Sequence, residues 1–335
     1  MSKSNQWRVL YQSRGTDDLY AMVRAALRPG FELVTLDGDD DAERLAKIAG
    51  VDAVIVAGAR LTRAHVAAGR RLRIVHHQGV GYHDTVDCAA LAERGLPLAI
   101  TPGGTAIGVS EHAIMMMLAV LKRLPWLDAE LRQGRFHVNS VRHVSYELHG
   151  KTIGIVGLGR IGKAVAERLK PFHVKAIYHD ILGFPAALER DLNVTRVPFD
   201  RLVAEADIVT IHVPRTQATV DMFDAAAFAR MKRTAFLVNT ARGGIVNEPA
   251  LAAALAEGRI AGAALDVFDV EPPPKTDPLY KFPNTVFTPH VSAGTRDAFV
   301  TKMDFVFRNL ETFFQGGAPE HMVDYVAELG LKPGP

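Results

Sequence analysis

The first third of the chain alternates short apolar runs with amphipathic segments. The apolar runs are rich in β-branched residues and lie at 9–11, 31–36, 53–56, 74–76 and 98–100. Segments with helical spacing, such as 19–27 and 42–49, lie between them. Continuous apolar strands separated by helices are typical of a parallel sheet that is covered by helices on both faces.

A second alternating series follows a different kind of segment. A Pro-Gly-Gly sequence at 102–104 ends the first pattern, and a long helical stretch at about 107–124 leads into a connector rich in His and Arg. The strand candidates of the second series are 152–156, 176–179, 208–213, 235–239, 263–265 and 286–288. The last helical stretch, 297–314, has no strand after it, so we expect it to pack on the first domain.

These two patterns predict an α/β fold of two doubly wound parallel-sheet domains. We expect residues 1–102 and 292–335 to form a flavodoxin-like domain, and residues 103–291 to form a Rossmann domain inserted into it. A chain of 335 residues is long enough for two such cores, because domains of this kind hold roughly 100 to 200 residues each.

Composition and charge narrow the class of protein. The chain is 48% hydrophobic and 23% charged with a net charge of +2, and its basic and acidic residues are interspersed rather than grouped as on a nucleic-acid-binding surface. The longest apolar run, 113–121, is well short of the ~20 residues that cross a bilayer. Cys88 is the single cysteine, without the Cys/His spacing of a metal site. We therefore expect a cytoplasmic protein without a nucleic-acid, membrane or metal partner.

The strongest local signal is the sequence Gly-Leu-Gly-Arg-Ile-Gly at 157–162. Glycines recur in many turns, so this spacing alone is weak evidence. Here it follows a strand candidate and opens a helical segment, which is the context of a dinucleotide-binding turn. In such a turn Gly157 makes the tight bend, Gly159 lets the backbone approach the pyrophosphate, and Gly162 lets the helix pack closely on the strand.

Asp180 ends the next strand candidate, about eighteen residues after the glycine turn. A carboxylate at this position accepts hydrogen bonds from the adenosine ribose and repels a 2′-phosphate. We therefore predict NAD as the cofactor, bound by the turn, which includes Arg160 and Ile161, and by Asp180. The alternative is a structural glycine turn with Asp180 facing solvent.

Arg242 lies just past a predicted buried strand, in the sequence Asn-Thr-Ala-Arg-Gly-Gly at 239–244. Ligands of open α/β sheets bind at the carboxyl ends of the strands, so this side chain is well placed to reach a substrate. A planar guanidinium matches a carboxylate with two hydrogen bonds, and such a pair also fixes the substrate's orientation. An ordinary surface arginine is the alternative.

Glu271 and His290 form the third candidate set. Interconversion of an alcohol and a ketone needs a group that holds and releases a proton near neutral pH, and imidazole suits this best. A carboxylate on the other ring nitrogen would orient the ring and stabilise its protonated form. Among thirteen histidines, His290 is distinguished by following the last strand candidate and a proline.

Taken together, these motifs resemble the D-isomer-specific 2-hydroxyacid dehydrogenase family. The resemblance covers nearly the whole chain, and the order of several motifs is far more specific than any one of them. The matching segments are 78–82, 102–105, 157–162, 239–243, 266–272 and 288–294.

The resemblance implies a role for each matched residue. Arg242 is implied as the anchor of the substrate carboxylate and carbonyl, His290 as the proton donor in reduction, and Glu271 as its partner. The backbone amides of Val80 and Gly81 would bind the substrate carboxylate from the flavodoxin-like domain. Residues implied in contacts to the cofactor are His212, Val213, Pro214, Thr240, Ala241 and Asp266. The family also implies a homodimer.

Three positions depart from the family pattern. His83 is an extra residue between Tyr82 and Asp84, so the rim of the substrate site is expected to differ. Arg215 stands where an apolar residue is common, and we expect it to face solvent rather than the cofactor. Phe136 replaces a frequent Trp in the connector, which relatives use near the partner's site. These departures leave the preferred substrate open.

We therefore predict an NAD-dependent oxidoreductase that interconverts a D-2-hydroxy acid and its 2-keto acid. Arg242 would anchor the substrate, and His290 with Glu271 would relay the proton. The alternative is a non-catalytic NAD(H)-sensing protein similar to a corepressor, which could lose the catalytic set without penalty. Glyoxylate, hydroxypyruvate, pyruvate and bulkier keto acids share the recognised carboxylate and carbonyl, so the sequence does not choose among them.

Overall fold

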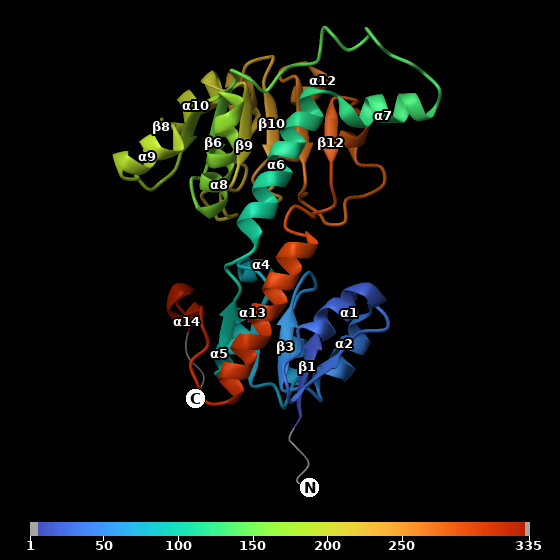
Figure 1. The fold of residues 1–335 in the computed structure, drawn as a ribbon, viewed down its shortest axis with the longest axis vertical. Helices are drawn as coiled ribbons and strands as arrows, with labels where there is room; N and C mark the ends of the chain where they lie inside the picture. The colour runs from blue at the N-terminus through green and yellow to red at the C-terminus, as the bar shows by residue number, and fades with distance from the viewer. Residues whose placement is uncertain (1–5, 332–335) are drawn as a thin grey trace. The chain divides into compact units, whose positions relative to one another are not determined.

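The computed structural model describes residues 6–331 of the chain. Its contacts divide into two compact units, one made from both chain ends, Met1–Thr105 with Arg296–Pro335, and the other from Ala106–Thr295. We call them the terminal unit and the central unit. Figure 1 labels many of their helices and strands.

The terminal unit is built on a five-stranded parallel sheet with strand order β2-β1-β3-β4-β5. Its strands are β1 (Trp7–Tyr11), β2 (Phe31–Val34), β3 (Ala53–Val56), β4 (Ile74–His77) and β5 (Leu98–Ile100). Its helices are α1 (Asp17–Ala25), α2 (Asp41–Ile48), α3 (Arg63–Ala68), α4 (Tyr82–Thr85), α5 (Cys88–Glu93), α13 (Arg296–Phe314) and α14 (Tyr325–Glu328). The strand order is that of flavodoxin-like folds, as predicted.

Helix α13 returns from the end of the central unit and covers one face of this sheet. Its buried side chains, including Met303, Val306 and Phe307, pack in one cluster with Val9 on β1 and Ile55 on β3. The strands of such a sheet are apolar on both faces because helices cover both, which explains their continuous hydrophobic runs. The predicted return of the last helix is confirmed.

The central unit is built on a seven-stranded parallel sheet with strand order β12-β11-β10-β9-β6-β7-β8. Its strands are β6 (Thr152–Val156), β7 (Lys175–His179), β8 (Val194–Arg196), β9 (Ile208–Ile211), β10 (Phe236–Asn239), β11 (Gly262–Leu265) and β12 (Thr285–Phe287). Counted from β6, the order contains the 3-2-1-4-5-6 arrangement of a Rossmann fold, with one further strand. The predicted fold class is therefore confirmed for both units.

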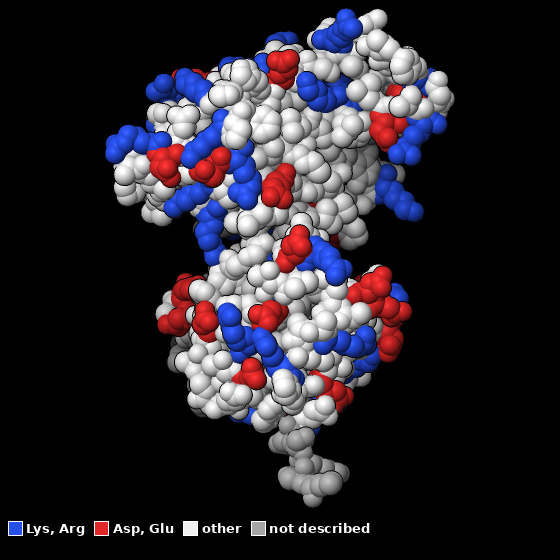
Figure 2. All heavy atoms as spheres, in the orientation of Figure 1, with Lys and Arg blue, Asp and Glu red and all other residues white. Residues whose placement is uncertain are grey.

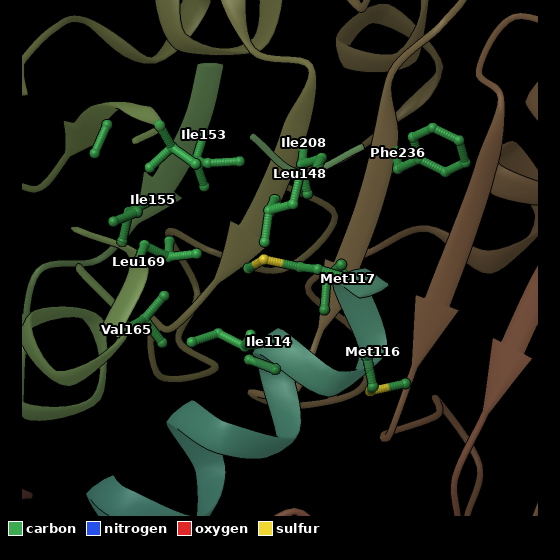
Figure 3. Packing of buried hydrophobic residues seen from close by; sticks show 14 of the residues in the cluster. Ile114, Met116, Met117, Leu148, Ile153, Ile155, Val165, Leu169, Ile208 and Phe236 are labelled. Carbon is green, nitrogen blue, oxygen red and sulfur yellow. The ribbon is translucent and has the colours of Figure 1, made fainter. Parts of the chain in front are cut away.

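Helices flank both faces of the central sheet. The helices of this unit are α6 (Thr105–Leu121), α7 (Leu124–Arg132), α8 (Arg160–Leu169), η1 (Lys170–Phe172), α9 (Ala186–Leu192), α10 (Phe199–Glu205), α11 (Ala225–Arg230), α12 (Glu248–Ala256) and η2 (Pro278–Lys281). Figure 3 shows Ile114, Met116 and Met117 of α6 packed in a cluster with Ile155 of β6 and Ile208 of β9. The apolar run at 113–121 is thus the core-facing part of a helix that covers the sheet.

Two elements of the central unit differ from the sequence-based expectation. The three-residue edge strand β8 was not predicted, because two of its three side chains are exposed and it has no continuous apolar run. The long helical stretch ends at Leu121 rather than near 124, and Arg123, in the left-handed conformation, precedes the separate helix α7. Helix α7 has no buried residue, and its Leu124 and Leu131 side chains are exposed.

The distribution of surface charge and the lengths of the helices are relevant to nucleic-acid and membrane partners. On the face shown in Figure 2, basic and acidic side chains are intermixed, and neither sign covers a broad patch. Among residues 6–331, no single helix has the length and apolar composition needed to cross a membrane; α6 and α7 meet that test only together, as a pair bent by 63°.

Gly162 sets how closely α8 packs on the turn that follows β6. A Cβ atom at this position would lie 2.1 Å from the carbonyl oxygen of Gly157, which no packed structure tolerates without a shift of backbone. At Gly159, by contrast, such a Cβ would meet no heavy atom of residues 6–331 within 4 Å apart from the glycine itself and its two chain neighbours. The two glycines therefore serve different purposes in the same turn.

We expect Gly162→Ala to destabilise the protein and Gly159→Ala to leave its stability nearly unchanged. The clash at Gly162 involves backbone, so relieving it should cost about 3 kcal/mol, and the melting temperature should fall by roughly 6 to 12 °C. Thermal unfolding followed by circular dichroism measures both variants. Equal melting temperatures for the two would contradict the assigned packing role of Gly162.

Candidate functional site

Five loops gather at the carboxyl edge of the central sheet. Strand order reverses between β6 and β9, which pair in parallel, and ligands of open α/β sheets bind at such a switch point. The loops that leave this edge contain the glycine turn at 157–162 and the segments 212–214, 240–244, 266–271 and 288–292. The fold therefore brings five of the sequence motifs to one edge of one sheet.

The glycine turn and its neighbours leave room and polar groups for a ligand. The open space at Gly159 lets another molecule approach the backbone there. Thr240, after β10, is buried, and its Oγ1 has no hydrogen-bond partner among residues 6–331. A buried hydroxyl without a partner is costly, so a polar ligand that reaches it would satisfy it. These features fit a dinucleotide.

Asp180 follows β7 beside the glycine turn. Its Oδ2 accepts a hydrogen bond from the Leu158 amide at 2.7 Å, and its Oδ1 accepts one from the Leu182 amide at 2.9 Å. A carboxylate offers about four acceptor positions, so two remain for ribose hydroxyls. The side chain is thereby both oriented and able to bind a sugar.

His212 follows β9 at the same edge of the sheet. Its Nε2 is 2.9 Å from Oγ1 of Thr210, and burial lowers the pKa of the imidazole to about 3. The His212 amide bonds to the Val156 carbonyl at 2.7 Å, which holds this loop beside the glycine turn. Val213 is half-buried and Pro214 is exposed at the same edge.

The loop that carries Arg242 is fixed by Asn239. Asn239 is buried; its Nδ2 donates to the Arg242 carbonyl at 3.0 Å, and its Oδ1 accepts from the Ala241 amide at 3.0 Å. Gly243 then passes so close to the next loop that a Cβ would lie 1.9 Å from the Phe268 carbonyl oxygen. The loop after β10 is thus pressed against the loop after β11. Arg242 lies on this rigid turn, and its Nη1 donates to the Ala241 carbonyl at 2.7 Å.

His290 and Glu271 form a hydrogen-bonded pair. The imidazole Nδ1 is 2.8 Å from Oε2 of Glu271, and both side chains are partly exposed to solvent. Oε1 of the same carboxylate accepts from the Phe268 amide at 3.0 Å, so Glu271 is fixed by its own loop. His290 has φ +53°, a left-handed conformation that costs about 1 kcal/mol for most residues and requires support from its neighbours.

That support comes from Asp266, which is fully buried at the end of β11. Its Oδ1 accepts from the Thr288 hydroxyl at 2.6 Å and the Val291 amide at 2.9 Å, and its Oδ2 accepts from the Ser292 amide at 2.9 Å. Its carbonyl oxygen accepts from the His290 amide at 2.7 Å. One residue therefore binds the loop on both sides of His290. A contact between Asp266 and the cofactor stays a prediction.

A second carboxylate, Glu248 at the start of α12, supports the loop that contains Glu271. Its Oε1 accepts from the Asp269 amide at 2.8 Å, and Asp269 in turn accepts from the Gly244 amide at 2.5 Å. Burial, with Asp269, Asp277 and Glu271 nearby, raises the pKa of Glu248 to about 6. These hydrogen bonds connect the Arg242 loop to the Glu271 loop, in addition to the close approach of Gly243 to Phe268.

Not all predicted site residues lie in the central unit. Val80 and Gly81 follow β4 in the terminal unit, where Val80 is exposed and Gly81 precedes the short helix α4. The extra residue His83 lies on α4, and its ring stacks on Tyr82 with centroids 4.0 Å apart. Arg215 is exposed, and its guanidinium lies against the backbone of Gly244. Phe136 is 78% exposed.

Sequence reasoning missed three residues that hold this site together. His112 on α6 reaches Thr288, Glu248 reaches Asp269, and Asp269 reaches Gly244. Each acts through a hydrogen bond to a segment far away or through a backbone amide. A single polar residue at a helix start, such as Glu248, is ordinarily a helix-capping signal, so the sequence offered no pattern to find it.

Comparison with known proteins gives one consistent answer. Residues 114–292 match the family model described as D-isomer specific 2-hydroxyacid dehydrogenase, NAD binding domain. A glyoxylate reductase of Korarchaeum cryptofilum is 39% identical, with 80% of each chain covered. A D-3-phosphoglycerate dehydrogenase of Archaeoglobus fulgidus is 37% identical over 80% of this chain, which spans only 50% of that relative's length. The solved structure of the TT0316 protein from Thermus thermophilus has a TM-score of 0.84 at 31% identity, covering 94% of this chain and 99% of that one.

We expect Glu248→Gln to stabilise the protein at alkaline pH. A carboxyl whose pKa is raised on folding favours the folded state at low pH, and that advantage is lost as the pH rises from about 4.5 to about 6. Glutamine keeps the acceptor for the Asp269 amide but carries no charge. Because Glu248 is only half-buried, we discount the gain to about 1 kcal/mol, or roughly 2 to 4 °C in melting temperature.

The measurement is thermal unfolding at pH 8 and pH 5, where the gain should be clearly smaller. The control is Glu257→Gln at the other end of α12, an exposed carboxylate. A gain for Glu248→Gln that does not change between the two pH values would show that its charge is not the cause.

Proposed function

We propose that this chain, which belongs to the D-isomer-specific 2-hydroxyacid dehydrogenase family, interconverts a D-2-hydroxy acid and its 2-keto acid. In the direction of reduction, the keto acid, NADH and a proton give the hydroxy acid and NAD⁺. The observation that carries the proposal is the hydrogen bond between His290 Nδ1 and Glu271 Oε2, at the carboxyl edge of the NAD-binding sheet. A histidine oriented in this way is suited to hold and release a proton.

The cofactor is NAD, and the chain offers residues for each of its parts. We assign the pyrophosphate to the glycine turn, including Arg160 and Ile161 at the start of α8, where backbone N–H groups and the helix dipole favour an anion. We assign the adenosine ribose to Asp180, and the remaining contacts to the loops at 212–214 and 240–241 and to Asp266. When bound, the nicotinamide supplies or accepts the hydride at C2 of the substrate.

His290 would act as the proton donor in reduction. As hydride reaches C2, negative charge develops on the carbonyl oxygen, and a proton on Nε2 of His290 would neutralise it. Glu271 lies on the opposite ring nitrogen, Nδ1, where it would orient the ring and stabilise the imidazolium ion, which carries a proton on each nitrogen. In oxidation the same imidazole would accept the proton from the hydroxyl group.

Arg242 would bind the substrate and polarise its carbonyl. Its guanidinium is planar and permanently charged, so it is able to engage a carboxylate and the adjacent carbonyl oxygen together. The rigid turn held by Asn239 and Gly243 supports this role, because a catalytic cation must be fixed to stabilise developing charge. We assign the second contact to the substrate carboxylate to the amides of Val80 and Gly81.

The expected homodimer also stays a prediction. Large apolar side chains on and after α7 are exposed, among them Leu131 at 58%, Phe136 at 78% and Val138 at 57%. Apolar groups of this size are costly in water, so this region supports association with a second copy of the chain.

A panel of 2-keto acids tests the proposed reaction. The purified protein is mixed with NADH or NADPH and with glyoxylate, hydroxypyruvate, pyruvate or a branched keto acid, and absorbance is followed at the nicotinamide band. We expect turnover with at least one acid and a preference for NADH, because Asp180 repels a 2′-phosphate. Tight NADH binding without turnover of any acid would favour the non-catalytic NAD-sensing alternative.

We expect His290→Ala to lower kcat by about 10² to 10⁴-fold, the usual contribution of a general acid–base, while NADH binding stays within about twofold. Steady-state kinetics and NADH fluorescence titration measure the two effects separately. His149→Ala is the matched control, since His149 is exposed and precedes β6 at the opposite end of the sheet. Full activity of His290→Ala would remove His290 from the mechanism.

A further inference from the structure

A histidine outside the proposed catalytic set bonds to the loop that carries His290. His112 lies on α6, and its Nε2 is 2.9 Å from Oγ1 of Thr288, a residue 176 positions later in the chain. Thr288 Oγ1 is in turn 2.6 Å from Oδ1 of Asp266, and His112 Nε2 is 3.6 Å from the same oxygen. The His112 side chain is 14% exposed, so this network is largely shielded from water.

The direction of each hydrogen bond in this network follows from the available protons. A hydroxyl group has one proton to donate, and the Thr288 hydroxyl donates it to Oδ1 of Asp266. Thr288 Oγ1 must then accept from His112, which therefore carries its proton on Nε2. His112 thus fixes the rotation of the Thr288 hydroxyl, and the hydroxyl completes the shell around the buried carboxylate.

Helix α6 also contacts the loop on the far side of His290. Gly108 lies one turn before His112 and close to this loop. A Cβ at Gly108 would be 3.3 Å from both the Ser292 carbonyl oxygen and Cγ2 of Thr295. The loop at 288–295 is therefore held against α6 at two points, one before His290 and one after it. Asp266 holds the same loop from the β11 side.

We propose that His112 is a positioning residue for the reaction, which it serves by locking the Thr288 hydroxyl onto Asp266 and so fixing the loop that presents His290 to the substrate. The inference rests on the proposed function, because it assigns His112 a role through His290. A left-handed residue such as His290 keeps its conformation only while its neighbours hold it there. A small displacement of a catalytic group of about 1 Å is enough to cost ~10²-fold in rate.

The first experiment compares His112→Ala with His112→Gln. Alanine removes the donor, whereas the Nε2 amide of glutamine lies near the position of the imidazole Nε2 and restores an N–H donor to Thr288. With the best keto acid of the panel, we expect His112→Ala to lower kcat by about 10- to 100-fold while KM changes less than about threefold. His112→Gln should recover kcat to within about threefold of the unmodified protein.

A double-mutant cycle tests whether His112 acts through Thr288. Thr288→Val removes the hydroxyl and keeps the shape of the side chain, and Thr288→Ser keeps the hydroxyl. If the two residues act as one unit, His112→Ala combined with Thr288→Val should lower kcat no further than the larger single change. Multiplicative losses of kcat in the double variant would overturn the proposed connection.

A third measurement does not depend on activity. Hydrogen–deuterium exchange followed by mass spectrometry reports how often the amides of Val291 and Ser292, both bonded to Asp266, open to solvent. We expect exchange of the peptide that contains them to speed up by about tenfold or more in His112→Ala, and to stay unchanged in His112→Gln and in the His149→Ala control.

These readouts separate the two proposals. Unchanged exchange and unchanged kcat in His112→Ala would overturn the role of His112, while the proposed reaction would stand. If His112→Ala speeds up exchange but the unmodified protein reduces no keto acid, His112 still holds the loop in place, and the proposed reaction is overturned. A loss of kcat that glutamine does not rescue, with unchanged exchange at Val291 and Ser292, would also overturn the positioning role.

Discussion

The buried carboxylate of Asp266 is the interaction on which the site depends. A charge with no exposed surface is expensive unless several donors satisfy it, and here a hydroxyl and two backbone amides do so. All three donors belong to the segment 288–292. The cost of leaving the charge unpaired therefore favours one conformation of that segment, and His290, in the middle of it, is held in a backbone region that few residues adopt.

The parallel sheet explains why residues far apart in sequence meet at Asp266. Parallel strands all end at the same edge, so the loops after β10, β11 and β12 become neighbours although helices separate the strands in the chain. Close packing then removes the freedom that loops usually have. Gly243 presses on the Phe268 carbonyl, Asp269 bonds to the Gly244 amide, and Glu271 bonds to both Phe268 and His290.

The sequence predicts the sheets well and the supports of the site poorly, for a physical reason. Buried parallel strands need continuous apolar runs, and a dinucleotide turn needs glycines at fixed spacing, so both leave patterns in a single chain. The order of motifs likewise identified Arg242, Glu271 and His290 as candidates. Hydrogen bonds such as those of His112 and Glu248 leave no such pattern, because their partners are set by the fold rather than by spacing. The edge strand β8 was missed because burial, the source of the signal, is absent there.

The carboxylates of Asp266 and Glu271, both near His290, lie in different surroundings. Asp266 is fully buried, and the three donors that bond to its carboxylate all belong to the segment 288–292. Glu271 is partly exposed, and one of its oxygens remains for the imidazole. A carboxylate that is exposed to water is able to respond to a change of charge on its partner. A buried carboxylate that is bonded to several donors is held in one arrangement. The segment 266–271 thus contains one carboxylate that fixes the backbone around His290 and a more accessible one that bonds to its imidazole.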